Sequence, residues 1–448
     1  MSRLLLISDQ VMLKAANQVL FNTVRGFLDA GMRVDLVFQK NTGHEFENLA
    51  RIEDLYADCL DRVSLSFFGA RFEHLFELGR RLWKIRKFRG ATPRPGKFPD
   101  SNTVIGFEHT RITPVWLSDA RITANWAGAY DVASQVAARN PPDVICGFEI
   151  GGAVPGERLA KRLGVPFFTR YMGTIVWPFL NSGTEHLVRP YIKGLSVDAD
   201  LIFMTNDGTK GDQVLNRLGI PKEKVRFRID GVNKSPVDKK FHQTDFYEKF
   251  KLRLPEGSVL VLCLSNHNGA YKRLDRAVRA AAFASLKNPA IHLILVGNGQ
   301  NTSGLKALAR ELSCEENVHF ISKVAHEDIP ILLNSVDIYL NTNDQSNLSH
   351  PVIEAMVAGK PVISMDDGSL DDIIRKGETG ILVAPRNCRV ELPAVLQRLA
   401  ENTLERQRLG NNARKFAASE FYSWKEKNLM ETNEVLELLK SGRSKKVG

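Results

Sequence analysis

Short runs of apolar residues alternate along most of the chain with stretches whose apolar residues recur at helical spacing. The apolar runs contain few polar positions, which is typical of strands buried on both faces of a sheet. Strands are predicted at Leu4–Ile7, Val34–Phe38, Asp143–Phe148, Val165–Thr169, Leu201–Thr205, Val225–Ile229, Val259–Leu264, His292–Val296, Val318–Ile321, Ile338–Leu340 and Pro361–Ser364. Helical stretches such as Ala15–Ala30 and Ala120–Ala138 separate them. The alternation predicts an α/β fold of doubly wound, Rossmann-like sheets.

The alternation is interrupted once, between residues 231 and 257, by a polar, charged and proline-containing segment. We interpret it as a linker and expect a first domain at 1–235, the linker at 236–257 and a second domain at 258–419. Residues 420–448 predict one more helix and a basic tail, which could cross back to the first domain. Ligands of such sheets bind at the carboxyl ends of the strands, so the site is expected in a cleft between the two domains.

The composition limits the classes of binding partner and indicates the cellular compartment. The 448 residues are 43% hydrophobic and 25% charged, which excludes a disordered or fibrous chain. The net charge of +10 favours nucleic acid, acidic lipids or phosphorylated substrates, but no known nucleic-acid-binding motif accompanies it, so we expect no nucleic-acid partner. Five scattered cysteines, no signal-peptide pattern and no apolar run of roughly 18–20 residues together predict a cytoplasmic protein.

A buried strand that ends at Val296 runs directly into a turn that contains Gly297 and Gly299. Glycines in such a turn let the backbone approach a bulky ligand, and the helix that follows offers free N–H groups to an anion. The next glycine is Gly304, so the spacing is not that of the nicotinamide-cofactor motif. A tight turn that packs against its own helix explains the glycines equally well, and both interpretations stay open.

The segment around Pro351 predicts a second anion site. Pro351 suits the first position of a helix, so the N–H groups of residues 348–352 would be free and Glu354 would lie on the first helical turn. A carboxylate in that place can accept hydrogen bonds from the hydroxyls of a nucleotide ribose. The alternative is a carboxylate that only complements the helix dipole.

Two cations, Lys272 and Arg273, stand where a helix is predicted to begin. Cations are unfavourable at this end of a helix, so local stability does not explain them, whereas a bound diphosphate would. The alternative is a solvated Lys-Arg pair. The acidic pair Asp198 and Asp200 has a spacing known from metal sites, but it precedes a strand and is interpreted as loop capping. No metal is therefore expected.

Five runs in the second half carry a resemblance to a known family: VGNGQ, VHFISKV, SVDIYLNT, IEAMVAGKPVIS and GETGILVAP. In their order and spacing, between residues 259 and 385, they resemble the nucleotide-binding domain of the retaining glycosyltransferases of family 4 (glycosyl transferases group 1). A weaker match covers residues 143–232. The resemblance implies the two-domain GT-B architecture, a UDP- or GDP-linked sugar as substrate, and no cofactor.

The resemblance also implies roles for individual residues. Glu354 matches the glutamate that holds the nucleotide ribose, and Lys272 matches the lysine that neutralises the donor diphosphate. The other donor-site matches are Lys323 and Val324 at the wall under the base, Leu348, Ser349 and His350 in the loop that meets phosphate and donor sugar, and Gly297 and Gly299 in the turn.

Several positions depart from the family pattern. Ser346 stands where the family has the first glutamate of its E-x7-E motif, and Asn266 stands near the place of an arginine. Phe148 and Met172 replace two histidines of the first domain. Glu149, which follows Phe148 at a strand end, is our candidate for activating the acceptor or contacting a sugar. The alternative is a solvated carboxylate in a loop.

Residues 71–89 combine seven cations and two acids with an apolar helical face. A basic amphipathic helix of this kind suits the surface of an anionic membrane; the alternative is an ordinary first-domain helix with its apolar face in the core. The residues assigned to membrane or acceptor contact are Arg80, Arg81, Trp83, Lys84 and Arg86. The expected location thus extends from the cytoplasm to the inner face of the membrane.

Together these features favour a retaining, metal-independent hexosyltransferase. It would move a sugar from a nucleotide-sugar to a glycan or lipid-linked acceptor, in the assembly of the cell envelope or an exopolysaccharide. Two alternatives stay open: a non-catalytic nucleotide-sugar-binding or regulatory protein, and a nucleotide-sugar epimerase on the same fold.

Overall fold

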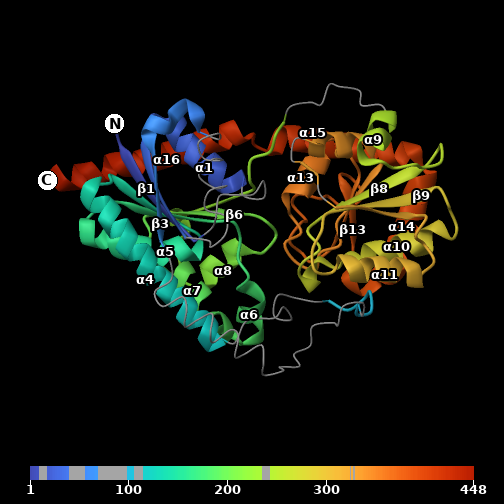
Figure 1. The fold of residues 1–448 in the computed structure, drawn as a ribbon, viewed down its shortest axis with the longest axis horizontal. Helices are drawn as coiled ribbons and strands as arrows, with labels where there is room; N and C mark the ends of the chain where they lie inside the picture. The colour runs from blue at the N-terminus through green and yellow to red at the C-terminus, as the bar shows by residue number, and fades with distance from the viewer. Residues whose placement is uncertain are drawn as a thin grey trace.

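The computed structural model describes residues 1–9, 18–39, 56–68, 98–104, 115–234, 243–322, 324–325 and 328–447. In these residues the chain forms two α/β units that lie side by side, each built on one parallel sheet (Figure 1). The predicted doubly wound fold is confirmed.

The first sheet has seven strands in the order β3-β2-β1-β4-β5-β6-β7. They are β1 (Arg3–Ser8), β2 (Arg33–Gln39), β3 (Val63–Phe68), β4 (Val144–Phe148), β5 (Phe167–Tyr171), β6 (Leu201–Thr205) and β7 (Val225–Arg228). The strand order reverses between β1 and β4, and ligands of doubly wound sheets bind at this point. Sequence analysis missed the edge strand β3, because Ser64 and Ser66 interrupt its apolar run.

Helices cover both faces of the first sheet. One face packs against the helices α4 (Val115–Arg139), α5 (Glu149–Leu163), α6 (Trp177–Ser182), α7 (Arg189–Leu195) and α8 (Gly211–Arg217). The other packs against α1 (Gln18–Asp29) and the C-terminal helix α16 (Trp424–Val447). Along β1, Leu5 and Ile7 face the first group, and Leu4 and Leu6 face the second. The strands lack polar alternation because both faces are buried.

The second sheet has six strands in the order β10-β9-β8-β11-β12-β13. They are β8 (Val259–Leu264), β9 (Ile291–Val296), β10 (Val318–Ile321), β11 (Ile338–Leu340), β12 (Val362–Met365) and β13 (Gly380–Val383). One face packs against α10 (Leu274–Ser285), α11 (Thr302–Glu311) and α14 (Cys388–Glu401). The other packs against α9 (Gln243–Phe250), α12 (Ile329–Ser335), α13 (His350–Val357) and α15 (Thr403–Glu420).

The chain passes between the two units at two adjacent places. After β7 it enters the second unit at Val232, which forms an isolated parallel bridge with Ser423, where the chain returns. Helix α16 then lies along α1 on the first unit (Figure 1). There the Glu434 carboxylate pairs with Arg228 at 2.7 Å. The first unit is therefore built from both ends of the chain.

Residues 98–104, which lie between β3 and α4 in the sequence, contact the second unit. Phe98 packs against the core cluster of β8, β9 and α10, and Figure 1 shows the segment in cyan beside α10 and α11. A short piece of the first half of the chain thus belongs to the surface of the second unit.

All five cysteines are buried thiols without a disulfide partner. Among the helices of the described ranges, none combines the length and the apolarity that a membrane crossing requires.

Candidate functional site

Polar residues directly follow the strands of both sheets, and the loops that carry them contact each other. Strands β1 and β4 pair in register, so Asp9 and Glu149, which follow them, lie on the same edge of the first sheet. Between the two units, the Leu348 N–H donates to the Asp207 carbonyl at 3.1 Å. The candidate site is built where these loops meet.

Lys272 lies in a short 3-10 turn directly before α10. Its Nζ is 4.9 Å from the centre of the Tyr271 ring, and its carbonyl accepts a hydrogen bond from Thr342 Oγ1 at 3.1 Å. Burial lowers the pKa of Lys272, and the nearby Asp207 carboxylate opposes this shift. Within the described ranges no residue forms an ion pair or hydrogen bond with Nζ. A desolvated ammonium group in this state favours an anionic ligand.

Arg273 is not a solvated cation. Its guanidinium is fully buried, pairs with the Asp275 carboxylate at 2.9 Å and lies 3.6 Å from the Asp344 carboxylate. Helix α10 begins at Leu274 rather than at Lys272 as predicted, so Arg273 is its N-cap, with a left-handed φ of +47°. The buried carboxylates of Asp275 and Asp344 balance the charge of Arg273. Of the two adjacent cations, Lys272 is the one that remains available to a ligand.

The N-terminus of α13 is a second feature of the candidate site that suits an anion. Ser349 precedes the helix in extended conformation. The N–H groups of Ser349 and His350 find no acceptor among the described residues, whereas the Leu348 N–H is used by Asp207. Free N–H groups and the helix dipole together suit an anion at this end of α13.

Glu354 lies on the second turn of α13, deeper than predicted, because the helix begins at His350 and its first turn contains no acidic residue. Burial raises the pKa of Glu354 to about 7, although the nearby His350 opposes the shift. In the described part of the chain nothing donates a hydrogen bond to its carboxylate, so the oxygens can accept one from a ligand hydroxyl. The dipole effect falls off beyond the first turn, which weakens the alternative interpretation of Glu354.

A buried network of charges lies behind α13. The His350 ring stacks on Trp424 with centroids 5.6 Å apart, and its Nε2 lies 3.3 Å from an Asp230 carboxylate oxygen. Burial alone would raise the pKa of Asp230, but Lys427 at 2.8 Å, His350, and Arg170 at 3.6 Å hold it well below its usual range. Asp230 in turn raises the pKa of His350 against the effect of burial. Asp230 thus favours the protonated, positively charged form of His350 beside the start of α13.

Three carboxylates face the junction from the first unit. Glu149 has a left-handed φ of +56° and accepts a hydrogen bond from the Met172 N–H at 2.5 Å. Burial raises the pKa of Glu149 to about 8, and the charges of Asp9 and Asp207 add to the shift. Glu149 is therefore a partly buried, hydrogen-bonded group that holds its proton at neutral pH, not a solvated loop carboxylate.

Sequence analysis missed Asp9 and Asp207. Burial raises the pKa of each to about 6. The Asp207 carboxylate accepts hydrogen bonds from the Thr209 N–H at 3.0 Å and from Ser346 Oγ at 3.1 Å. Asp9 directly follows β1, and Asp207 lies two residues after β6. Their place at the carboxyl ends of buried strands is the sequence signal that could have identified them.

The glycine turn is explained by packing within the protein. A Cβ atom on Gly297 would lie 1.9 Å from the Ser265 carbonyl oxygen, and one on Gly299 would lie 2.5 Å from Asn268 Oδ1. Asn266 Oδ1 accepts a hydrogen bond from the Asn268 N–H at 3.2 Å. The turn that follows β8 therefore packs closely against Gly297 and Gly299. Sequence analysis had explained the two glycines by a ligand or by packing against the helix that follows them.

The remaining assignments lie elsewhere. Val324 is partly buried against the apolar cluster between the second sheet and α13. Asp198 pairs with Lys224 at 3.0 Å and Asp200 accepts from the Phe167 N–H at 2.9 Å, so both serve local structure. Within the described ranges no group of three His, Cys, Asp or Glu side chains could hold a metal ion. The assigned residues outside the described ranges are Lys323, Arg80, Arg81, Trp83, Lys84 and Arg86.

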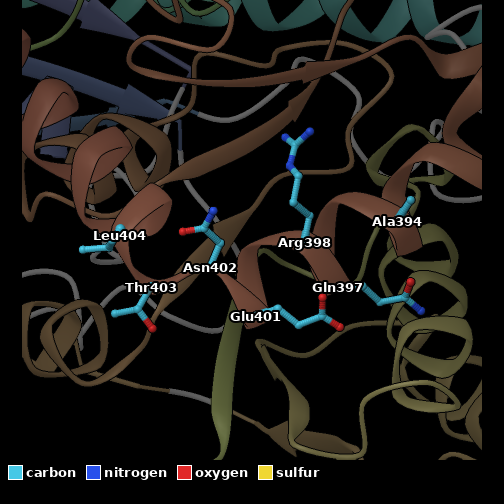
Figure 2. A pocket seen from close by; sticks show the side chains of 7 residues that line it. All are labelled: Ala394, Gln397, Arg398, Glu401, Asn402, Thr403 and Leu404. Atoms are coloured by element: carbon cyan, nitrogen blue, oxygen red, sulfur yellow. The ribbon is translucent and has the colours of Figure 1, made fainter.

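Two hollows lie away from the junction. One, of about 700 Å³, lies where α14 ends and α15 begins, and Figure 2 shows Arg398, Glu401 and Asn402 around it. The other, of about 690 Å³, lies beside α6 and α8, between Trp177 and Phe227. Neither is lined by a residue of the candidate site, so we give them no role in it.

Comparison with known proteins finds a family for the second unit. Residues 246–416 match the family model of glycosyl transferases group 1. The chain is 33% identical over 135 residues to the MMP alpha-(1->4)-mannosyltransferase of Mycolicibacterium hassiacum, which covers 30% of this chain and 32% of that protein. It is 27% identical over 247 residues to an uncharacterized glycosyltransferase of Methanocaldococcus jannaschii. That match covers 54% of this chain and 59% of that protein. The chain thus spans from about a third to about three-fifths of these relatives.

Solved structures resemble almost the whole chain. The crystal structure of Anabaena HepE in complex with UDP-glucose has a TM-score of 0.67 at 16% identity and covers 98% of this chain and 100% of that one. WaaG, a glycosyltransferase involved in lipopolysaccharide biosynthesis, has a TM-score of 0.61 at 17% identity. The match covers 95% of this chain and 98% of WaaG. At this identity the likeness shows the fold, which is the two-domain GT-B architecture.

Proposed function

We propose, from the glycosyl transferases group 1 domain at residues 246–416 and the GT-B fold of the chain, that this protein is a glycosyltransferase. It moves a sugar from a UDP- or GDP-linked donor to an acceptor hydroxyl. One observation carries the proposal: Lys272, for which the described residues offer no ion-pair partner, lies with the open N-terminus of α13 and with Glu354 on the side of the second unit that contacts the first. This combination suits a nucleoside diphosphate.

In the proposed reaction the bond between the anomeric carbon and the diphosphate oxygen breaks, and a bond to the acceptor oxygen forms with retention of configuration. The acceptor's proton passes to the leaving phosphate. Negative charge develops on the diphosphate, where Lys272 and the N–H groups of Ser349 and His350 stabilise it. Preorganised donors of this kind each contribute about 10²–10³ to the rate.

Glu354 is assigned to the ribose of the donor nucleotide. Its ionised carboxylate accepts hydrogen bonds from the ribose hydroxyls, and the low solvent exposure that raises its pKa to about 7 also strengthens such bonds. The ionised form makes the stronger, charge-assisted bonds. Donor binding is therefore linked to the protonation of Glu354.

Glu149 is assigned to a contact with the donor or acceptor sugar. A general base must be ionised at the working pH, and a carboxyl group with a pKa of about 8 holds its proton at neutral pH. The protonated group can donate a hydrogen bond to a sugar hydroxyl. Of the two roles considered for Glu149, sugar contact is the one that its environment favours.

We extend the proposal to a glycan or lipid-linked acceptor of the cell envelope or an exopolysaccharide, reached at the cytoplasmic face of the membrane. The basic amphipathic pattern of residues 71–89 and the net charge of +10 support a contact with anionic lipid, and the structurally similar WaaG is involved in lipopolysaccharide biosynthesis. Neutralising Arg80, Arg81, Lys84 and Arg86 should release the protein from anionic vesicles. Unchanged cosedimentation would remove the membrane contact from the proposal.

Purified protein and a panel of UDP- and GDP-sugars test the activity. We expect UDP or GDP to raise the melting temperature, since a ligand that binds only the folded state stabilises it. We also expect slow donor hydrolysis, or transfer, that Lys272→Ala abolishes. Binding without turnover would instead support a non-catalytic nucleotide-sugar-binding protein, and conversion of the donor sugar without an acceptor would support an epimerase.

A further inference from the structure

Residues 98–104 bring backbone carbonyls to a buried arginine directly beside Lys272. Arg273 donates from Nη2 to the Asp100 carbonyl at 2.9 Å and from Nη1 to the Thr103 carbonyl. Its remaining donors go to the Asp275 carboxylate, from Nε at 3.0 Å and Nη2 at 2.9 Å. A guanidinium has five N–H donors, so Asp275 alone cannot satisfy this one.

A second buried arginine repeats the pattern one turn along α10. Arg276 donates from Nε to the Ser101 carbonyl at 2.7 Å and from Nη2 to the Thr103 carbonyl at 3.0 Å. Its Nη1 donates to the Thr342 carbonyl at 3.3 Å and to the Asp344 carboxylate. Arg276 therefore joins residues 98–104 to the loop that follows β11.

This loop and the Lys272 turn are also tied to each other. Thr342 Oγ1 donates to the Lys272 carbonyl at 3.1 Å, and the Asp344 N–H donates to the Tyr271 carbonyl at 2.8 Å. The same loop continues through Ser346 to the N-terminus of α13. Both parts of the candidate site in the second unit, Lys272 and α13, thus connect to the two arginines.

Side chains anchor the segment from its two ends. Phe98 packs into the apolar cluster beneath α10. Asn102 Oδ1 accepts a hydrogen bond from the Arg389 N–H at 3.0 Å, and the Cys388 thiol donates to the Ser101 carbonyl at 2.8 Å. The segment is therefore docked by specific contacts on α14 as well as on α10.

We propose that residues 98–104 form a clamp, supplied by the first half of the chain, that positions the Lys272 turn and the loop leading to α13. When the clamp leaves, buried guanidinium donors lose their acceptors, so the turn and loop cannot keep their arrangement. Binding of a nucleoside diphosphate and docking of the clamp then favour each other. This coupling rests on the proposed donor site, whereas the clamp itself does not.

Hydrogen exchange measured by mass spectrometry tests the clamp without any ligand. The double variant Phe98→Ala/Asn102→Ala removes both anchors and changes no residue of the donor site. We expect exchange at least tenfold faster than in the unaltered protein, both in residues 98–104 and in residues 270–276. The matched control is Asp100→Asn, which weakens the exposed pair with Arg389 but keeps an oxygen that can accept from the Asn102 N–H, and it should leave both rates within twofold. Faster exchange confined to 98–104 would overturn the proposal.

Titration calorimetry with UDP and with GDP tests the coupling. We expect the double variant to bind the preferred nucleotide about tenfold more weakly, and saturating nucleotide to slow exchange of residues 98–104 in the unaltered protein. A stabilising contact with no link to the site would produce neither effect. Asn102→Asp, which keeps the acceptor oxygen, should restore binding relative to Asn102→Ala. Binding within twofold in every variant would overturn the coupling.

Two outcomes separate this proposal from the proposed function. If neither UDP nor GDP binds the unaltered protein, the donor site is wrong, and the exchange of residues 270–276 alone decides the clamp. If the double variant does not fold, Asn102→Ala takes its place, because Asn102 is exposed and its substitution spares the core. The exchange of residues 98–104 and of residues 270–276 is then compared between Asn102→Ala and Asp100→Asn.

Discussion

The two units contribute opposite chemistry to the junction between them. The second-unit wall, formed by Lys272, the N–H groups of Ser349 and His350, and Glu354, offers an unpaired cation and open donors. The first-unit wall, formed by Asp9, Glu149 and Asp207, offers carboxyl groups whose pKa values burial raises to about 6, 8 and 6.

Under the proposed function, this difference assigns the two halves of the transfer reaction to different walls. A diphosphate is drawn to the donors of the second-unit wall and repelled by ionised carboxylates. Hydroxyl groups of a sugar are neutral and form hydrogen bonds with carboxyl groups in either protonation state. Under the proposed function, the donor's phosphates and its ribose belong to the second-unit wall, and the transferred and acceptor sugars belong to the first-unit wall, so substitutions should separate the two.

The largest effect is expected from Lys272→Ala. Loss of the Lys272 ammonium group, which forms no ion pair or hydrogen bond with a described residue, should lower kcat by about 10²–10³, as measured with the donor that the unaltered protein accepts. Arg273→Ala is no control, because it breaks a buried ion pair. Near-normal kcat in Lys272→Ala would remove this wall from the mechanism.

Glu354 should affect nucleotide binding more than turnover. A hydrogen bond to a charged group is worth about 1.5–3 kcal/mol, so Glu354→Ala should weaken nucleotide binding at least tenfold at pH 8, measured by calorimetry. The stronger, charge-assisted bond needs the ionised carboxylate, and the pKa of Glu354 is about 7. The affinity of the unaltered protein should therefore fall as the pH drops below 7. Glu354→Gln should lack that part of the pH dependence, and parallel pH profiles would contradict the assignment.

Substitution of Glu149 should change the pH dependence of the protein's stability rather than its nucleotide affinity. Its folded-state pKa of about 8 lies above the ordinary value of 4.5, so the folded protein holds a proton that the unfolded chain releases. The free energy of unfolding must then decrease as the pH rises from about 4.5 to 8. Glu149→Gln should melt at a higher temperature than the unaltered protein at pH 8 and at the same temperature near pH 4.5. A constant difference across this range would show that Glu149 does not titrate as described.

The smallest effect is expected from Ser346→Ala. The Ser346 hydroxyl donates a hydrogen bond to Asp207 across the junction, and a bond of this kind contributes about 1 kcal/mol. We expect kcat/KM to stay within about fivefold of normal, with a slightly lower melting temperature. A loss as large as that of Lys272→Ala would make Ser346 a direct contact of the donor sugar.

The sequence was most informative where chemistry and fold depend on local patterns. Uninterrupted apolar runs predicted most strands of both sheets. Lys272 was selected because a cation is unfavourable before a helix, and Glu354 because it matches a glutamate of the family motif; both assignments remain predictions. The predicted start of α13 was wrong by one residue, because the helix begins at His350 rather than at Pro351, and this places Glu354 just beyond the first turn.

Other features have no local signal. The contacts of residues 98–104 come mostly from backbone carbonyls, which every residue carries, so no sequence pattern marks them. Arg273 looked like a partner of Lys272, because its pairing with the nearby Asp275 and its burial against the distant Asp344 both depend on the tertiary structure. Asp9 and Asp207 follow buried strands, which the sequence does indicate, but the burial that raises their pKa values is created by the tertiary structure.

The position of α16 has a consequence for dissecting the molecule. Val435 and Leu439 belong to the same apolar cluster as Leu20 and Val24 of α1, although the chain reaches them only after completing the second unit. A fragment made of residues 1–234 would leave that cluster open to water, while a fragment of residues 243–420 would contain every strand of its own sheet. Reassembling the protein from two pieces therefore requires the last helix as a separate peptide, or a circular permutation that joins it to Met1.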